Sequence, residues 1–207
     1  ISAIVLSMWS ATKGTKSLIS ALNIAYDESE ERGFIWLNLL SLTATVFVVV
    51  LAVIAIGTVV AVPVILAYVG LGTIAEGLIE WLRWPMLAAV VLIALAALYR
   101  FGPSRRKARW QWVTWGSGMA LTLWLLASFL FSYYVANFGS YNATYGSVGA
   151  VVVLLMWLFL SAQVVLLGAA INAEMERQTA VDTTHGGSQP MGQRGAYVAD
   201  NLPARDP

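Results

Sequence analysis

The sequence contains no cysteine and a single histidine, His185. Without cysteine there is no disulfide, no thiolate metal site and no cysteine nucleophile. A metal-dependent hydrolase needs several His, Asp, Glu or Cys side chains that converge on one point. Histidine-based serine catalysis would have to use His185. These absences argue against an enzyme, and we expect no catalytic residue, no metal site and no cofactor.

Charge is scarce as well. Charged residues form 11% of the 207 residues and hydrophobic residues form 59%, whereas a soluble domain is about 25% charged and about 45–50% apolar. A soluble fold of this length cannot hide so much apolar surface, so the expected partner is the lipid bilayer. The net charge of +1 provides no basic field of the kind that drives nucleic-acid binding, and no nucleic acid is expected.

Two very long segments carry no charge at all. They are Gly33 to Ala75, with 43 residues, and Trp110 to Ala173, with 64 residues. About 20 apolar residues cross a bilayer as a helix, so the first segment accommodates one span and the second accommodates two. A further apolar run ends at Tyr99. The pattern predicts an all-α polytopic membrane protein with about four complete transmembrane helices, at about residues 34–68, 78–99, 115–135 and 148–171.

The remaining segments are assigned by length and polarity. Ile1–Trp9 is apolar but too short to cross a bilayer, and we interpret it as the end of a truncated earlier span. Residues 10–32 are amphipathic and are expected at the cytoplasmic surface. A single helical membrane domain is therefore expected over residues 1–173. Residues 174–207 are polar and without periodicity, which predicts a disordered cytoplasmic tail.

The positive charges predict the orientation of the chain in the membrane. One loop supplies five cations and no acid: Arg100, Arg105, Arg106, Lys107 and Arg109. This loop is either a patch for nucleic acid or an anionic ligand, or the basic loop that membrane proteins keep in the cytoplasm. Its position between two spans favours the second interpretation. With the loop inside, eleven of the twelve Lys and Arg residues are cytoplasmic, and so is the C-terminus.

Small and polar residues of the last predicted span recur along one helical face. They are Gly146, Ala150, Trp157, Ser161, Gly168 and Asn172. The stripe either lines a cavity or forms a packing seam, because small residues let helix backbones approach and Ser or Asn side chains hydrogen-bond between helices. We favour the packing seam. No ionisable group lies in the middle of a span, which counts against a proton relay.

The turn before this span and the polar end after it add further candidates. They are Asn137, Tyr141, Asn142 and Tyr145 in the turn, and Glu174 at the end of the span. The aromatic rings are expected to anchor the turn at the membrane interface. The amide side chains either cap the next helix or bind a polar ligand, so packing and ligand binding both stay open for this group.

Three blocks of the sequence resemble one known family. They are ALNIAYDE at residues 21–28, RWPMLAAVVLIALAALYRFGPSRR at 83–106 and FGSYNATYGSVGAVVVLLMWLFLSAQVVLLGAAINAEMER at 138–177. Their order and spacing are similar to those of the YihY/BrkB family of bacterial inner-membrane proteins. The resemblance implies about six spans in a full-length member and a location in the bacterial inner membrane. The positions that match the family's pattern are Asn137, Tyr141, Asn142, Tyr145, Gly146, Gly168, Asn172 and Glu174.

The resemblance also brings the labels "ribonuclease BN" and "virulence factor" that many family members carry. This sequence supplies no nuclease residues, so we interpret the first label as inherited naming. The favoured hypothesis is a non-enzymatic inner-membrane protein for envelope transport or lipid handling. A structural or assembly factor is the alternative, with a second copy of the chain or other envelope proteins as partners. A membrane-bound ribonuclease is the third hypothesis.

Overall fold

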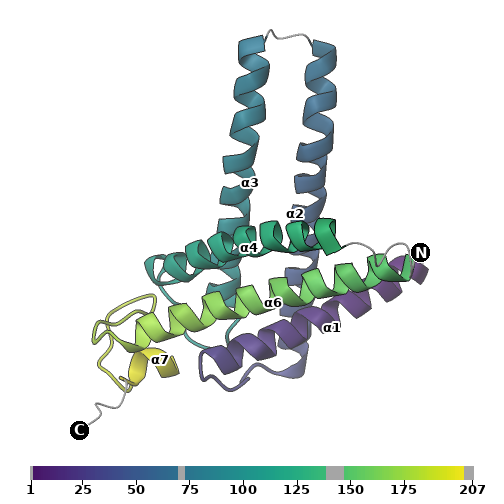
Figure 1. The fold of residues 1–207 in the computed structure, drawn as a ribbon. Coiled ribbons are helices and arrows are strands. Elements are labelled where there is room, and N and C mark those ends of the chain that lie inside the picture. The colour runs from purple at the N-terminus through teal and green to yellow at the C-terminus, as the bar shows by residue number, and fades with distance from the viewer. Residues whose placement is uncertain (1, 70–72, 139–146, 203–207) are drawn as a thin grey trace. The chain divides into compact units, whose positions relative to one another are not determined.

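The computed structural model describes residues 2–69, 73–138 and 147–202. These residues form helices and the segments that connect them, and no β-strand occurs among them. In chain order the helices are α1 (Ser2–Ala25), α2 (Phe34–Val69), α3 (Thr73–Phe101), α4 (Trp110–Phe138), α6 (Ser147–Arg177) and α7 (Tyr197–Asp200) (Figure 1). The predicted all-α fold is therefore confirmed.

Four of these helices are long and apolar enough to cross a membrane. Their candidate spans are Phe34–Ile65, Gly77–Phe101, Trp110–Asn137 and Val148–Arg177. Each predicted span overlaps one of them, so the prediction of four spans is confirmed. The uncharged runs located the spans because lipid supplies no partner for a bare backbone group, and a continuous helix satisfies those groups internally.

The first helix differs from its prediction in one respect. Ile1–Trp9 and the amphipathic residues 10–32 were expected to be separate segments, but α1 is one continuous helix from Ser2 to Ala25 and crosses the boundary between them. Hydroxyl side chains accommodate the polar stretch within the helix. Thr12 and Ser17 each donate a hydrogen bond to the carbonyl oxygen four residues earlier, at 2.7 and 3.2 Å. The change from apolar to polar sequence is therefore not a helix boundary.

The chain divides into two compact units. The first unit contains residues 1–20 and 31–94, which form most of α1, all of α2 and most of α3. Its α1 and α2 are linked by a hydrogen bond of 2.7 Å between the hydroxyls of Thr15 and Thr45 and by a bond from the Lys16 ammonium to the Asn38 amide oxygen. Helix α2 exposes most of its large apolar side chains, as expected of a surface that faces lipid.

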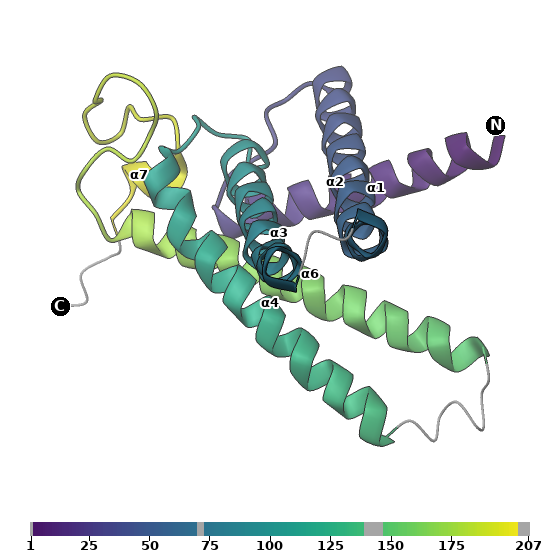
Figure 2. The same ribbon diagram turned by 90° about the horizontal axis from the view of Figure 1, so that it is seen from above.

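The second unit contains residues 21–30 and 95–207. Helices α4 and α6 pack against each other in it, together with the ends of α1 and α3 and the C-terminal segment. Figure 2 shows that α4 and α6 cross and then diverge toward the end of α4 and the start of α6. Its buried side chains include Tyr26, Tyr99 and Val113.

The C-terminal segment contradicts the predicted disordered tail from residue 174. Helix α6 continues to Arg177, and residues 178–202 are folded and end in α7. Three charged side chains organise this segment by bonding its backbone. Asp182 accepts from the N–H groups of Thr184 and Gln189, Asp200 accepts from those of Gly192 and Arg194, and Arg194 donates to the carbonyls of Ala180 and Ala199. The polar composition of this segment suggested disorder because it offers little apolar core. Hydrogen bonds from charged side chains to the backbone order it instead.

Candidate functional site

Helices α4 and α6 approach each other closely where both contribute glycine. A methyl group added at Gly116 would collide with the carbonyl oxygen of Gly168 and with the side chain of Asn172. The buried Asn172 amide accepts from the N–H of Gly116 at 2.8 Å and donates to the carbonyl of Val113 at 3.3 Å. An amide in the membrane needs such partners, and α4 supplies them here.

Two reciprocal tryptophan–serine pairs join the middles of the same helices. The Trp124 indole donates to the Ser161 hydroxyl at 2.9 Å, and the Trp157 indole donates to the Ser128 hydroxyl at 3.3 Å. The two indole rings meet edge to face, with their centroids 5.7 Å apart. These bonds satisfy the polar end of each indole away from water. They tie the stripe residues Trp157 and Ser161 of α6 to α4.

Beyond the tryptophan pair, the divergence of the helices leaves an apolar groove with a volume of about 430 Å³. We call it the α4–α6 groove, and its lining is almost wholly apolar: Phe131, Val152, Leu155, Met156, Phe159 and Leu160. It lies within the candidate spans of both helices. No sequence signal marks it, because its bulky apolar lining looks like any lipid-facing run.

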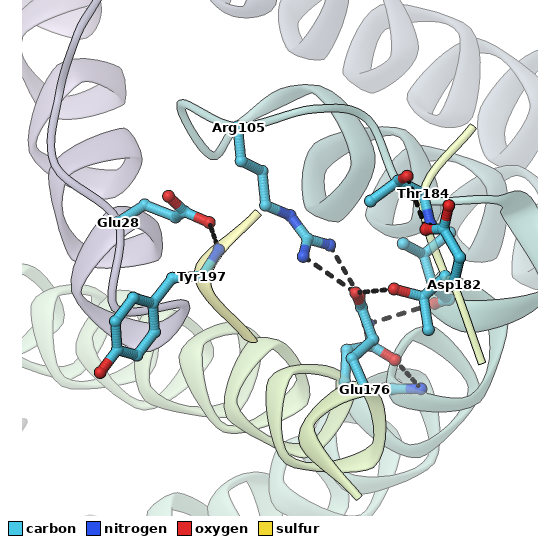
Figure 3. Close-up of polar contacts among 10 residues, drawn as sticks. Glu28, Arg105, Glu176, Asp182, Thr184 and Tyr197 are labelled. Atoms are coloured by element: carbon cyan, nitrogen blue, oxygen red, sulfur yellow. Dashed lines mark hydrogen bonds and ion pairs between the residues drawn. The ribbon is translucent and has the colours of Figure 1, made fainter. Parts of the chain in front are cut away.

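The opposite end of the same helix pair holds a buried ion pair. The guanidinium of Arg105 donates two hydrogen bonds to the carboxylate of Glu176, at 2.9 and 2.6 Å, and both side chains are fully buried (Figure 3). Thr183 donates a third bond to this carboxylate at 2.8 Å. The guanidinium lies 4.4 Å from the centre of the Tyr26 ring. We call these four residues the loop–tail cluster, because they join the basic loop to the C-terminal segment.

Burial and charge shift two pKa values in the loop–tail cluster. Burial raises the pKa of the Tyr26 phenol, so the ring stays neutral. Burial by itself lowers the pKa of Arg105, but the hydrogen bonds and the charge of Glu176 more than offset it, and the net pKa is raised. Breaking such a pair leaves an uncompensated buried charge. The ion pair therefore holds the basic loop and the end of α6 together.

The C-terminal segment lies along the basic loop. Arg109 donates to the carbonyl of Thr184 at 2.9 Å, and Arg106 donates to that of Gly187 at 3.4 Å. Further backbone bonds join Lys107 to His185 and Arg109 to Thr183, each at 2.8 Å. These contacts use Arg106 and Arg109 as structural cations, which their prediction as topogenic charges did not foresee.

The end of α1 reaches the same region of the second unit. The Asn23 side chain accepts from the N–H of Ser104 at 2.7 Å, and Glu28 accepts from the N–H of Tyr197 at 2.7 Å (Figure 3). Asp27 forms an ion pair with Arg177. The three sequence blocks that carried the family resemblance thus meet around the loop–tail cluster. No pattern in the sequence predicted this meeting.

The other predicted site residues are scattered. Asn137 is exposed and donates to the carbonyl of Tyr133 at 2.8 Å, and Glu174 is exposed and accepts from Gln178 at 3.0 Å. The remaining turn candidates lie outside the described residues: Tyr141, Asn142, Tyr145 and Gly146. Among the residues that the structure describes, no three His, Asp or Glu side chains are grouped so as to hold a metal ion.

Comparison with known proteins places the chain among membrane proteins. The profile of the family described as virulence factor BrkB matches residues 1–192. The ribonuclease-like protein YfkH of Bacillus subtilis is 34% identical over 183 residues, which is 84% of this chain and 65% of YfkH. UPF0761 membrane proteins of Tolumonas auensis and Idiomarina loihiensis are 34% and 29% identical over 103 residues, about half of this chain.

This chain is shorter than the relatives that it matches. The matched region covers 65% of YfkH and about a third of the Tolumonas and Idiomarina proteins, 32% and 35% respectively. No solved structure matches the chain. The comparisons therefore supply a family, and the geometry of the second unit supplies the sites.

Proposed function

The chain belongs to the virulence factor BrkB family of membrane proteins, and from this premise we propose that it is a non-enzymatic protein of the bacterial inner membrane that handles lipid. The α4–α6 groove carries this proposal. Its lining is apolar and it lies within two candidate spans. An acyl chain fits such a lining, whereas a polar solute would lose its hydrogen bonds to water there without replacement.

The packing of the polar stripe supports the same choice. Asn172, Ser161 and Trp157 direct their polar atoms to partners on α4. A polar path along this face would need groups that are open to a passing solute. The bonds between α4 and α6 use these groups for packing, which leaves the apolar groove as the site for a ligand in this helix pair.

The non-enzymatic part of the proposal rests on how the acidic side chains are used. Glu176 is held by Arg105 and Thr183, and Asp182 and Asp200 are held by backbone N–H groups. Carboxylates fixed in this way support the fold. Full-length protein that cleaved RNA in a metal-dependent manner would contradict this part, and it would favour an activity of the kind named in the ribonuclease-like relative.

A lipid with a photoreactive acyl chain tests occupancy of the groove. Purified protein in phosphatidylcholine vesicles is irradiated, and the labelled residues are mapped by mass spectrometry. Label is expected on Met156 and Phe159. Leu155→Trp fills the groove and should reduce this label several-fold. Leu126→Trp is the matched control, because Leu126 is similarly exposed, at 53% against 59% for Leu155, but does not line the groove. Equal labelling in both variants would contradict the proposal.

One observation favours an assembly factor as the second candidate function. The C-terminal segment is folded onto the basic loop, and together they form an ordered surface to which a partner protein could bind. In that case Arg109→Gln, which removes a bond from loop to segment, would reduce recovery of the partner without changing lipid labelling. Under the lipid-handling proposal, Leu155→Trp should reduce lipid labelling without changing recovery of the partner.

A further inference from the structure

Arg100, in the last turn of α3, is a buried cation. Arg100 is only 7% exposed, and its Nε and Nη1 atoms are buried and have no hydrogen-bond partner among the residues that the structure describes. Within the described part of the chain it also forms no ion pair. Its guanidinium instead lies 4.4 Å from the Trp110 ring centre and 5.6 Å from that of Phe101.

A second cation approaches the same aromatic rings. The Lys107 ammonium lies 5.0 Å from the centre of the Phe101 ring, and this side chain is exposed. The other loop cations, Arg105, Arg106 and Arg109, donate to Glu176 or to carbonyls of the C-terminal segment. The basic loop thus divides into three structural cations and two cations that meet at the Phe101–Trp110 pair.

The stabilisation that the fold gives to Arg100 is incomplete. A position at the C-terminal end of a helix is worth about 0.3–1 kcal/mol to a cation, and a cation–π contact is worth about 0.5–2 kcal/mol. Neither of them supplies an acceptor for the N–H groups, and a buried charge that lacks hydrogen bonds is costly. An anion that accepts from the guanidinium would remove this cost.

The position of the aromatic pair indicates where that anion comes from. Phe101 ends one candidate span and Trp110 begins the next, and aromatic rings at such positions lie at the level of lipid headgroups. Both rings are partly exposed, at 39% and 48%, so they can pack against the glycerol and upper acyl region of a lipid whose phosphate reaches the cations.

We propose that Arg100 and Lys107 bind the phosphate of an anionic phospholipid, with Phe101 and Trp110 against its glycerol region. The planar guanidinium suits two phosphate oxygens at once, and the ammonium adds a point charge. The site lies at the opposite end of α4 from the α4–α6 groove. The proposal of this phosphate site therefore does not depend on the proposed function of the groove.

Native mass spectrometry of the full chain tests the proposal. The protein is released from detergent in the presence of equimolar phosphatidylglycerol and phosphatidylcholine, and the retained lipids are counted. The unaltered chain should retain phosphatidylglycerol preferentially. Arg100→Gln should lower this preference about tenfold, which is the loss expected for one charge-assisted bidentate contact. Arg106→Gln removes the same charge from the same loop and should leave the preference within about twofold.

Further arms separate the proposal from its rivals. Arg100→Lys should restore part of the preference, and Lys107→Gln, at an exposed position, should lower it even if Arg100→Gln fails to fold. Equal losses in Arg100→Gln and Arg106→Gln would overturn the site, because only the charge of the loop would then matter. Displacement of phosphatidylglycerol by equimolar inorganic phosphate or by an RNA oligonucleotide would also overturn it, in favour of free phosphate or RNA.

Discussion

Glu176 shows how one residue can stabilise a junction between distant segments. Its carboxylate receives two bonds from Arg105 and one from Thr183, with no exposure to solvent. The neighbouring acid Glu174 is exposed. Two acids that are two positions apart on one helix therefore have different roles, and their chemistry alone does not distinguish them.

Glu176→Gln should destabilise the protein by about 3 kcal/mol, because it leaves the buried Arg105 charge without its counter-charge. Thermal unfolding in a mild detergent, followed by circular dichroism, measures the effect. Glu174→Gln is the control and should stay within about 0.5 kcal/mol of the unaltered protein. Equal stability of the two variants would show that the buried pair contributes nothing.

Asp182 predicts how the C-terminal segment responds to acid. Burial raises the pKa of Asp182, but the hydrogen bonds from Gln189 and Thr184 and the charge of Arg194 lower it by more, so that the net pKa is about 2. Because this value lies below the unfolded pKa of about 3.9, the carboxylate's contribution is complete above about pH 4. It is lost as the pH falls through about 2.

Amide hydrogen exchange of Thr184 and Gln189, corrected for the intrinsic pH dependence, measures this loss. Protection should be constant above about pH 4 and should decline toward pH 2. Asp182→Asn should show weaker protection already at neutral pH and no such decline. A decline of the same size in this variant would assign the acid sensitivity to another group.

At the scale of the helix, the α4–α6 pair combines a close end with an open end. Gly116 and Gly168 let the backbones approach, the tryptophan–serine pairs fix the middle, and the helices then diverge around the groove. The spacing of small and polar residues on α6 left a packing seam and a lined cavity open for this face. It did not predict the groove, because divergence depends on the side chains of both helices together.

Gly116→Ala should destabilise the pair by about 1–3 kcal/mol, since the new methyl group collides with the Gly168 carbonyl and forces the helices apart. Gly118→Ala is a matched control on the same helix, because nothing lies within 4 Å of a methyl group there. The control should be neutral or slightly stabilising, given the higher helix propensity of alanine. Thermal unfolding of both variants measures the difference. Equal destabilisation would mean that the close approach of the helices at Gly116 does not contribute to stability.

On the scale of the whole molecule, the spans followed from the sequence and the sites did not. Uncharged runs are a local property, and the four spans were found from them. The Arg105–Glu176 pair joins residues 71 positions apart, and no local pattern pairs them. The folded C-terminal segment escaped prediction because its order rests on a few specific bonds, such as those of Asp182 and Asp200, and its composition resembles that of a disordered chain.

The orientation of the chain stays a prediction from its charges. Because the sequence has no cysteine, single-cysteine variants can be labelled without background. Gln193→Cys should react with an impermeant maleimide only after the inner membrane is opened, and Asn137→Cys should react in intact spheroplasts. Both positions are exposed. The reverse pattern would place the basic loop and the C-terminus outside the cytoplasm.

The central claim is that the α4–α6 groove serves lipid handling, and lipid movement in reconstituted vesicles tests it most directly. Vesicles that carry a fluorescent phospholipid are treated with dithionite, which quenches only the outer leaflet. We expect the chain to speed the loss of the protected fraction, Leu155→Trp to slow it several-fold, and Leu126→Trp to have no effect. A chain that moves no lipid, or that moves it equally well in both variants, would contradict the account.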